Sequence, residues 1–224
     1  MKLYMHPVST GVRPVRMLLA DNGIACDEEL VDISTGAQHQ PAYASKNPNR
    51  LVPMLEDGDF RLTEASAILK YIADKYDLPV YPRDLKKRAR VNEVMDWLNT
   101  QLVRELAYGL VYPQLFPHHK RRSDEAHEGA IEWGQARARK WLQVLNDHWI
   151  GPDNNYLCGD ELTIADYFGA AVVTLGELIG CDFAAYPNIR RWLGTMKKLP
   201  SWNKANEVFE GFAGANKGKS FVTV

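Results

Sequence analysis

Short apolar runs separated by turn residues occupy the first third of the chain, and they predict four β-strands. The runs lie at residues 2–5, 29–33, 51–55 and 60–62. Asp57-Gly58, between the last two runs, is typical of a hairpin turn, so these two strands are expected to be neighbours in one sheet.

Helical spacing of apolar residues fills the gaps between these strands. One helix is expected to begin near Val12 and to stop at Asn22-Gly23, because glycine suits the left-handed position after a helix. A short helical piece is expected at residues 42–44, and Thr63 is the predicted N-cap of a third helix. The order β-α-β-α-β-β-α is typical of an α/β domain.

The rest of the chain shows only helical periodicity. The apolar positions on one face of its first long helix are Val91, Val94, Met95, Leu98, Leu102 and Leu106. Further helices are expected over residues 123–149, from Thr163, and beyond Pro187 and Pro200. Pro79 and Pro82 fit a linker better than a helix interior. We therefore predict an α/β domain at residues 1–77, a linker at 78–86 and an all-helical domain at 87–224.

The charge balance excludes one class of partner. Lys and Arg total 27 against 28 for Asp and Glu, which is a net charge of -1. A protein that binds nucleic acid through its phosphates carries a basic excess instead. No apolar run reaches the length of a membrane span. We therefore expect neither a nucleic-acid partner nor a membrane partner.

The cysteines and histidines give no sign of a metal site. Cys26, Cys158 and Cys181 lie far apart and form no Cys-x-x-Cys pair. This spacing argues against a disulfide scaffold and a cysteine zinc site, and it favours a cytoplasmic protein. His118-His119 has no acidic or thiol companion nearby, so no metal is expected there.

Pro53 interrupts an apolar strand, where it has no N–H to donate to the sheet. Two explanations fit this position about equally well. A cis Val52-Pro53 bond would turn the N–H and C=O of Val52 outward, where they can pair with an extended peptide ligand. Alternatively, Pro53 lies on an edge strand that binds no ligand.

Two further positions combine a helix start with groups that bind a charged ligand. Ser9 and Thr10 lie between the first strand and the first helix, a common ligand position in open α/β sheets. Glu64-Ala65-Ser66 opens the helix after the hairpin. Its N–H groups favour a carboxylate and Glu64 favours an ammonium group, which suits an amino-acid end. Ordinary helix capping also explains both positions.

Four segments together resemble the cytosolic glutathione transferase family, in its serine-type classes and as a theta/delta-like bacterial member. They run from Tyr4 to Gly23, from Asn47 to Leu55, from Leu62 to Tyr76 and from Leu162 to Asp166. The last segment has the spacing of an N-capping box, with Thr163 and Asp166 as its two members. The resemblance implies a thioredoxin-like α/β N-terminal domain followed by an all-α C-terminal domain.

The resemblance also implies which residues bind glutathione, the co-substrate of the family. Val52, beside cis-Pro53, matches the residue that pairs with the cysteinyl backbone. Glu64 and the next residue match the pair that holds the γ-glutamyl end. The family usually has Ser or Thr after this acid, whereas this chain has Ala65. Ser66 compensates only if the helix start shifts by one residue.

Two more positions match glutathione-binding residues of the family. Arg50 occupies a place where such proteins often carry Lys or Gln near the cysteinyl-glycyl part. Gln38 and His39 resemble a Gln-His pair that some classes direct at the glycine carboxylate. A solvated loop histidine explains His39 about equally well.

Ser9 matches the catalytic serine of the serine-type classes. A free thiol with a pKa of about 8.5 is mostly protonated at neutral pH. A hydroxyl hydrogen bond and the helix dipole stabilise the thiolate, which then attacks an electrophile. Thr10 is a rival for this role, and Tyr4, the position that tyrosine-type classes use, ranks third.

The function that the resemblance implies is conjugation of glutathione to small apolar electrophiles, by a cytoplasmic homodimer that serves detoxification. The alternatives are a glutathione-dependent peroxidase or disulfide reductase, and a non-catalytic interaction protein of the same fold. The electrophile is expected to bind between the two domains.

Overall fold

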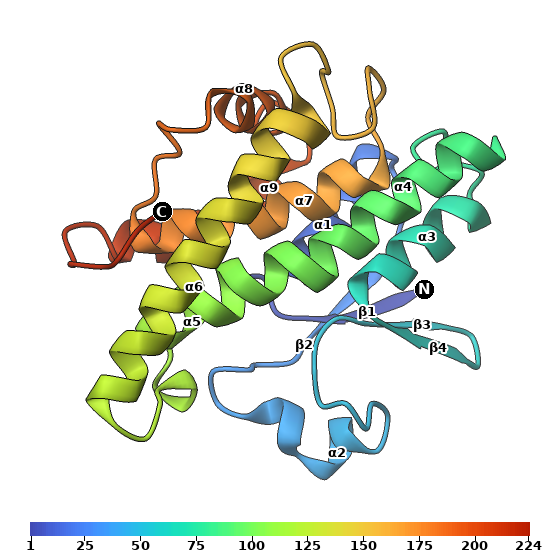
Figure 1. The fold of residues 1–224 in the computed structure, drawn as a ribbon. Helices are drawn as coiled ribbons and strands as arrows, with labels where there is room; N and C mark the ends of the chain where they lie inside the picture. The colour runs from blue at the N-terminus through green and yellow to red at the C-terminus, as the bar shows by residue number, and fades with distance from the viewer.

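The four strands of the first domain form one mixed sheet in the computed structural model, which describes residues 1–224 (Figure 1). They are β1 (Lys2–Met5), β2 (Asp27–Leu30), β3 (Met54–Asp57) and β4 (Phe60–Thr63), in the order β2-β1-β3-β4. β1 and β2 are parallel, while β3 is antiparallel to both β1 and β4. A parallel pair requires a crossover, which here contains one helix.

That crossover helix is α1 (Val12–Asp21), and it shares one face of the sheet with α3 (Ala65–Lys75) (Figure 1). The opposite face carries the short helices η1 (Ala37–His39) and α2 (Pro41–Ala44). A separate small core lies between the sheet and α2, and it consists of Tyr4, Val31, Tyr43 and Met54. The predicted helix stop is confirmed, since Gly23 has a φ of 62°.

Two strand predictions are displaced from the observed strands. The run at 29–33 was expected to be a strand, but β2 ends at Leu30 because its four residues pair with the four residues of β1. Val31 still donates to the Met5 carbonyl, and the side chain of Asp32 then accepts hydrogen bonds from Ser34 as the chain turns. The run at 51–55 was also expected to be a strand, but β3 begins only after Pro53.

The hairpin and the helix that follows it also differ from prediction by one residue. Asp57 pairs with Phe60, so the turn consists of Gly58 and Asp59, and Gly58 has a φ of 65°. Thr63 was predicted to cap α3, but it is the last residue of β4. The N-cap residue is Glu64, and its side chain makes no capping hydrogen bond.

The second domain is entirely helical (Figure 1). Its elements are α4 (Leu85–Trp97), η2 (Leu98–Val111), α5 (Tyr112–Leu115), η3 (Pro117–His119), α6 (Asp124–Val144), η4 (Leu145–Ile150), α7 (Ile164–Val173), η5 (Thr174–Ile179), α8 (Pro187–Met196) and α9 (Trp202–Ala215). The six apolar positions predicted on one face of the first long helix are all buried. None of the helices is both long and apolar enough to span a membrane.

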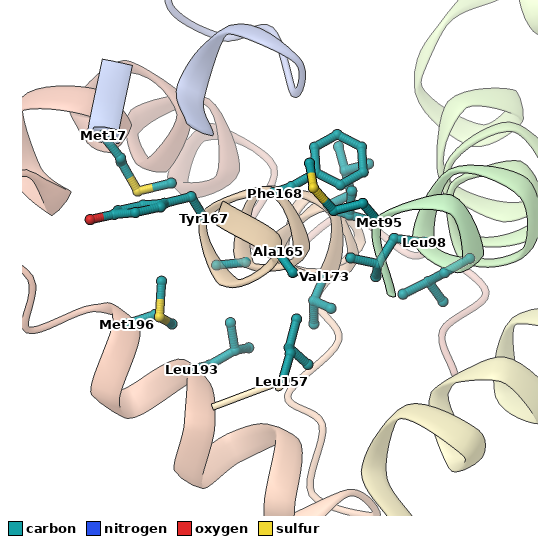
Figure 2. Packing of buried hydrophobic residues seen from close by; sticks show 14 of the residues in the cluster. Met17, Met95, Leu98, Leu157, Ala165, Tyr167, Phe168, Val173, Leu193 and Met196 are labelled. Carbon is teal, nitrogen blue, oxygen red and sulfur yellow. The ribbon is translucent and has the colours of Figure 1, made fainter. Parts of the chain in front are cut away.

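α7 packs against helices of both domains, and every one of its residues is buried. Figure 2 shows Ala165, Tyr167, Phe168 and Val173 of α7 among Met17 of α1, Met95 and Leu98 of the first long helix, and Leu193 and Met196 of α8. The hydroxyl of Tyr167 also donates to Asp21 of α1 at 2.9 Å. Burying a large apolar side chain contributes about 1.5–3 kcal/mol, so this packing fixes the domains relative to each other.

Candidate active site

Three segments meet around Gly11, and each of them contains a different motif of the sequence. A Cβ atom at this position would lie 2.9 Å from Pro53 Cδ, 3.5 Å from Ala65 Cβ and 3.8 Å from the Val52 carbonyl oxygen. Glycine therefore permits the loop after β1, the Val52-Pro53 bond and the start of α3 to approach this closely. The close approach brings Ser9 and Thr10 to the same place in the fold as Val52 and Glu64.

The Val52-Pro53 peptide bond is cis, as predicted. Pro53 directly precedes β3, which has a partner strand on each side, so the alternative of an edge-strand proline is wrong. Neither the N–H nor the C=O of Val52 forms a hydrogen bond within the chain. Because buried or half-buried backbone groups need partners, Val52 is free to pair with an extended ligand.

The segment before this bond is held by two side chains. The hydroxyl of Tyr43 and the amide of Asn47 both donate to the carbonyl of Leu51, at 2.6 and 2.8 Å. Asn47 is part of the motif that carries the family resemblance, but its role as a support for the loop was not predicted. Its signal in the sequence is an Asn-Pro pair that precedes the Val-Pro pair by a few residues.

The start of α3 presents open backbone donors. The first helical hydrogen bond of α3 runs from the N–H of Ile68 to the carbonyl of Glu64. The N–H groups of Ala65, Ser66 and Ala67 therefore have no acceptor in the chain. Such a helix start favours an anion. Capping by Thr63 was the competing explanation, and the structure contradicts it.

Glu64 is exposed and has a strained backbone, with φ 67° and ψ 114°. A non-glycine residue at positive φ costs about 1–3 kcal/mol, and such strain gathers at functional sites. In this conformation Glu64 directly precedes the open N–H groups of α3. A carboxylate and free N–H groups side by side suit a ligand that carries both an ammonium group and a carboxylate.

The loop after β1 distinguishes its two hydroxyls. Gly11 is the N-cap of α1, without any side-chain hydrogen bond, so neither Ser9 nor Thr10 caps this helix. The Ser9 carbonyl accepts from the N–H groups of Val12 and Arg13, each at 3.1 Å, while its half-buried hydroxyl has no partner. The Thr10 hydroxyl lies 3.3 Å from the hydroxyl of Tyr112. Ser9 therefore offers the free hydroxyl of the pair.

Tyr112 was not predicted as part of the site. It begins α5 in the helical domain, and burial raises the pKa of its hydroxyl, which stays protonated. The contact with Thr10 brings the helical domain to the edge of the loop that carries Ser9. Nothing in the local sequence indicates this contact, because Thr10 and Tyr112 are 102 positions apart.

The remaining predicted residues lie at or beyond the margin of the site. Tyr4 is buried beneath α2, and its hydroxyl accepts from Lys46 at 2.9 Å, so it is not directed at the Ser9 loop. Arg50 and His39 are exposed on the segments before the cis bond, and Ser66 is half-buried in the first turn of α3. The structure brings the loop that carries Ser9, at Gly11, against Val52, Pro53 and Ala65, and Glu64 directly precedes Ala65. It shows no contact of Arg50 or His39 with these residues.

Comparison with known proteins identifies the family. Residues 1–74 match the model of the glutathione S-transferase N-terminal domain, and residues 110–200 match that of its C-terminal domain. Human glutathione S-transferase theta-1 is 32% identical over 200 residues, which cover 86% of this chain and 80% of that protein.

Solved structures agree with this match. Human glutathione transferase theta-2, solved as a complex with glutathione and an unknown ligand, has a TM-score of 0.84 and 27% identity, covering 99% of this chain and 92% of that one. A delta-class glutathione transferase of Nilaparvata lugens has a TM-score of 0.80 and 29% identity, covering 96% of this chain and 98% of that one. This chain belongs to the glutathione S-transferase family and is of its theta/delta type.

Proposed function

We propose that this protein conjugates the thiolate of glutathione to small apolar electrophiles. The observation that carries the proposal is that the loop with the free hydroxyl of Ser9 meets, at Gly11, two segments with unpaired backbone groups, one at Val52 and one at the start of α3. The theta-class relatives, which bear the name glutathione S-transferase, support the same activity. Nothing in the site favours a peroxidase, a disulfide reductase or a non-catalytic protein.

Each part of glutathione then has a partner. The backbone of Val52 pairs with the cysteinyl residue, and Glu64 holds the ammonium group of the γ-glutamyl end. The N–H groups of Ala65 and Ser66 hold its carboxylate, so the missing hydroxyl at position 65 removes one hydrogen bond and leaves the backbone donors in place. Arg50 and His39 are proposed to act at the cysteinyl-glycyl part and the glycine carboxylate.

The proposed reaction begins with loss of the thiol proton to solvent, while Ser9 donates a hydrogen bond to the resulting sulfur anion. The sulfur then attacks the electrophilic carbon of the second substrate. A carbon–sulfur bond forms as the bond to the leaving group breaks, and the leaving group departs with the bonding electron pair. We propose that the electrophile binds between the domains, near Thr10 and Tyr112, whose hydroxyls lie 3.3 Å apart.

Glutathione binding tests this proposal directly. The protein should be retained on immobilised glutathione, and it should conjugate an aryl halide faster than it reduces a hydroperoxide.

Glu64→Gln removes the charge opposite the ammonium group, so the affinity for glutathione should fall about three- to tenfold, as expected for a partly solvated ion pair. Glu161→Gln alters an exposed acid of the helical domain and should leave it unchanged. Equal affinity in both variants would contradict the role of Glu64, and no retention at all would contradict the function.

We also propose that the protein is a cytoplasmic homodimer, as the family resemblance implies. Its net charge of -1 offers little electrostatic resistance to self-association. All three cysteines are free, in keeping with a reducing compartment. Light scattering at micromolar concentration should give twice the mass of one chain. A mass of one chain under these conditions would count against the dimer without affecting the proposed reaction.

A further inference from the structure

Arg13, in the first turn of α1, has a side chain that is entirely excluded from solvent. Its guanidinium donates to three oxygens of the helical domain, all of them neutral: the Ala171 carbonyl at 2.6 Å, the Asn206 amide at 2.9 Å and the Thr174 hydroxyl at 3.0 Å. The ring of Phe209 lies 3.7 Å from the guanidinium carbon.

No carboxylate lies within salt-bridge distance of this cation, and its Nε atom has no partner. Burial lowers the pKa of Arg13 to about 9, which still leaves the side chain charged at neutral pH. Burying an unpaired charge is expensive, and proteins usually pair such groups with an acid. The positive charge of Arg13 is therefore uncompensated at close range.

Arg13 belongs to the first turn of α1, which directly follows the Ser9 loop. The N–H of Arg13 donates to the Ser9 carbonyl, two residues before the N-cap of the helix. A cation in the first turn is unfavourable for the helix because that end is already positive. The charge of Arg13 and the positive end of the α1 dipole therefore both favour an anion at Ser9.

Tyr112 provides a second link between Arg13 and the site. The charge of Arg13 acts to lower the pKa of the Tyr112 hydroxyl, against the larger effect of burial, so the two groups lie within electrostatic range. That hydroxyl in turn lies 3.3 Å from Thr10. The other charged groups that act on Arg13 are Glu177 of η5 and Glu210 of α9. Both are engaged elsewhere, Glu177 with Lys197 at 2.7 Å and Glu210 with the Trp202 indole at 2.7 Å.

We propose that the uncompensated charge of Arg13 favours the thiolate form of glutathione bound at Ser9. Because Arg13 is buried, it touches neither substrate and is a positioning residue that acts through the field at the start of α1. Charges in a protein interior interact about fourfold more strongly than in water. This inference rests on the proposed function, since it concerns the thiol that the function requires.

A purely structural role is the competing explanation, because the same hydrogen bonds tie α1 to α7 and α9. Replacing Arg13 itself would not distinguish the structural from the electrostatic role, since the variant is liable to unfold. Variants of Asn206 do distinguish these two roles. Asn206→Asp places a negative charge against the guanidinium with almost no change of shape, whereas Asn206→Leu removes the hydrogen bond without adding charge. Both variants lose the amide donor to the Trp202 carbonyl and to Met17 Sδ, so they are matched in this respect.

The measurement is the pH titration of bound glutathione, followed by the ultraviolet absorbance of its thiolate, together with the pH–rate profile. Asn206→Asp should move the thiolate titration to higher pH and lower conjugation at neutral pH about three- to tenfold. The loss should vanish at alkaline pH, where the thiol ionises in both proteins. Asn206→Leu should unfold at lower temperature but titrate like the wild type. The protein's own thiols do not interfere, because burial raises the pKa of Cys26, Cys158 and Cys181.

A purely structural role predicts that Asn206→Leu is the poorer catalyst and that the titration does not shift in Asn206→Asp. That result would overturn the inference.

Glu210→Gln gives an independent test if Asn206→Asp does not fold. It removes a negative charge near Arg13, so the titration should move slightly to lower pH, and a shift to higher pH would contradict the proposal. A wild type that binds glutathione without any thiolate band refutes this inference alone. A wild type that does not bind glutathione refutes the proposed function.

Discussion

Replacing Ser9 by alanine should lower conjugation at neutral pH by about ten- to a hundredfold and leave glutathione affinity nearly intact. A neutral hydroxyl that donates to a charged sulfur contributes on the order of 1.5–3 kcal/mol. At 1.36 kcal/mol per pKa unit, the loss of that bond raises the thiol pKa enough to reduce the thiolate by this factor. Affinity should hold because Val52 and the start of α3 contact other parts of the tripeptide.

The sign of the pH dependence follows from the same argument. Ser9 lowers the pKa of the bound thiol, so its removal costs most below that pKa and nothing once solvent deprotonates the thiol in both proteins. The pH–rate profiles of Ser9→Ala and wild type should therefore converge at alkaline pH. A loss that stays constant with pH would indicate damage to the site instead of a lost hydrogen bond to the thiolate.

Thr10→Ala is the matched control, because Thr10 is the adjacent hydroxyl and is already paired with Tyr112. We expect it to weaken the contact between the loop and α5 without a pH-dependent loss of rate. If Thr10→Ala alone shows the pH-dependent loss, the thiolate donor is Thr10 and the assignment to Ser9 is wrong. If neither variant shows it, backbone N–H groups hold the sulfur.

Features that depend on neighbouring residues were predictable from the sequence. The buried face of the first long helix and the helix that begins after Ser123 both follow from the helical spacing of apolar residues. The cis bond at Pro53 was predicted as one of two alternatives, because a proline within an apolar strand has few explanations. In each case the residues that determine the structure lie within a few positions of it.

Features that depend on pairing across the chain were not predictable in the same way. β2 is an edge strand whose Asp27 and Glu28 are exposed, so its position follows from the register with β1 and not from apolar residues of its own. The contact between Thr10 and Tyr112 joins residues in different domains. The burial of Arg13 likewise depends on acceptors from α7, η5 and α9, and a single arginine in a helix gives no sign of it.

Replacing Asp166 by alanine should strongly destabilise the fold. Asp166 is completely buried, and its carboxylate accepts four hydrogen bonds. The donors are Leu157 N–H at 2.8 Å, Thr163 N–H at 2.9 Å, Thr163 Oγ1 at 3.0 Å and Trp192 Nε1 at 3.0 Å. The predicted capping box is therefore present, and it also anchors the loop before α7 and the core of α8.

Asp166→Ala leaves the two buried N–H groups and the Trp192 indole without acceptors. Each such group costs about 1–3 kcal/mol, and because the losses are not fully additive we expect a total of about 3–5 kcal/mol. That is a large fraction of the 5–15 kcal/mol by which folded proteins are typically stable. Since α7 joins the domains, urea unfolding at fixed protein concentration should shift as one transition that includes the thioredoxin-like domain. Asp153→Ala, an exposed acid in the preceding loop, should change stability by less than about 0.5 kcal/mol. Equal effects of the two variants would show that the four hydrogen bonds do not stabilise the fold as the geometry indicates.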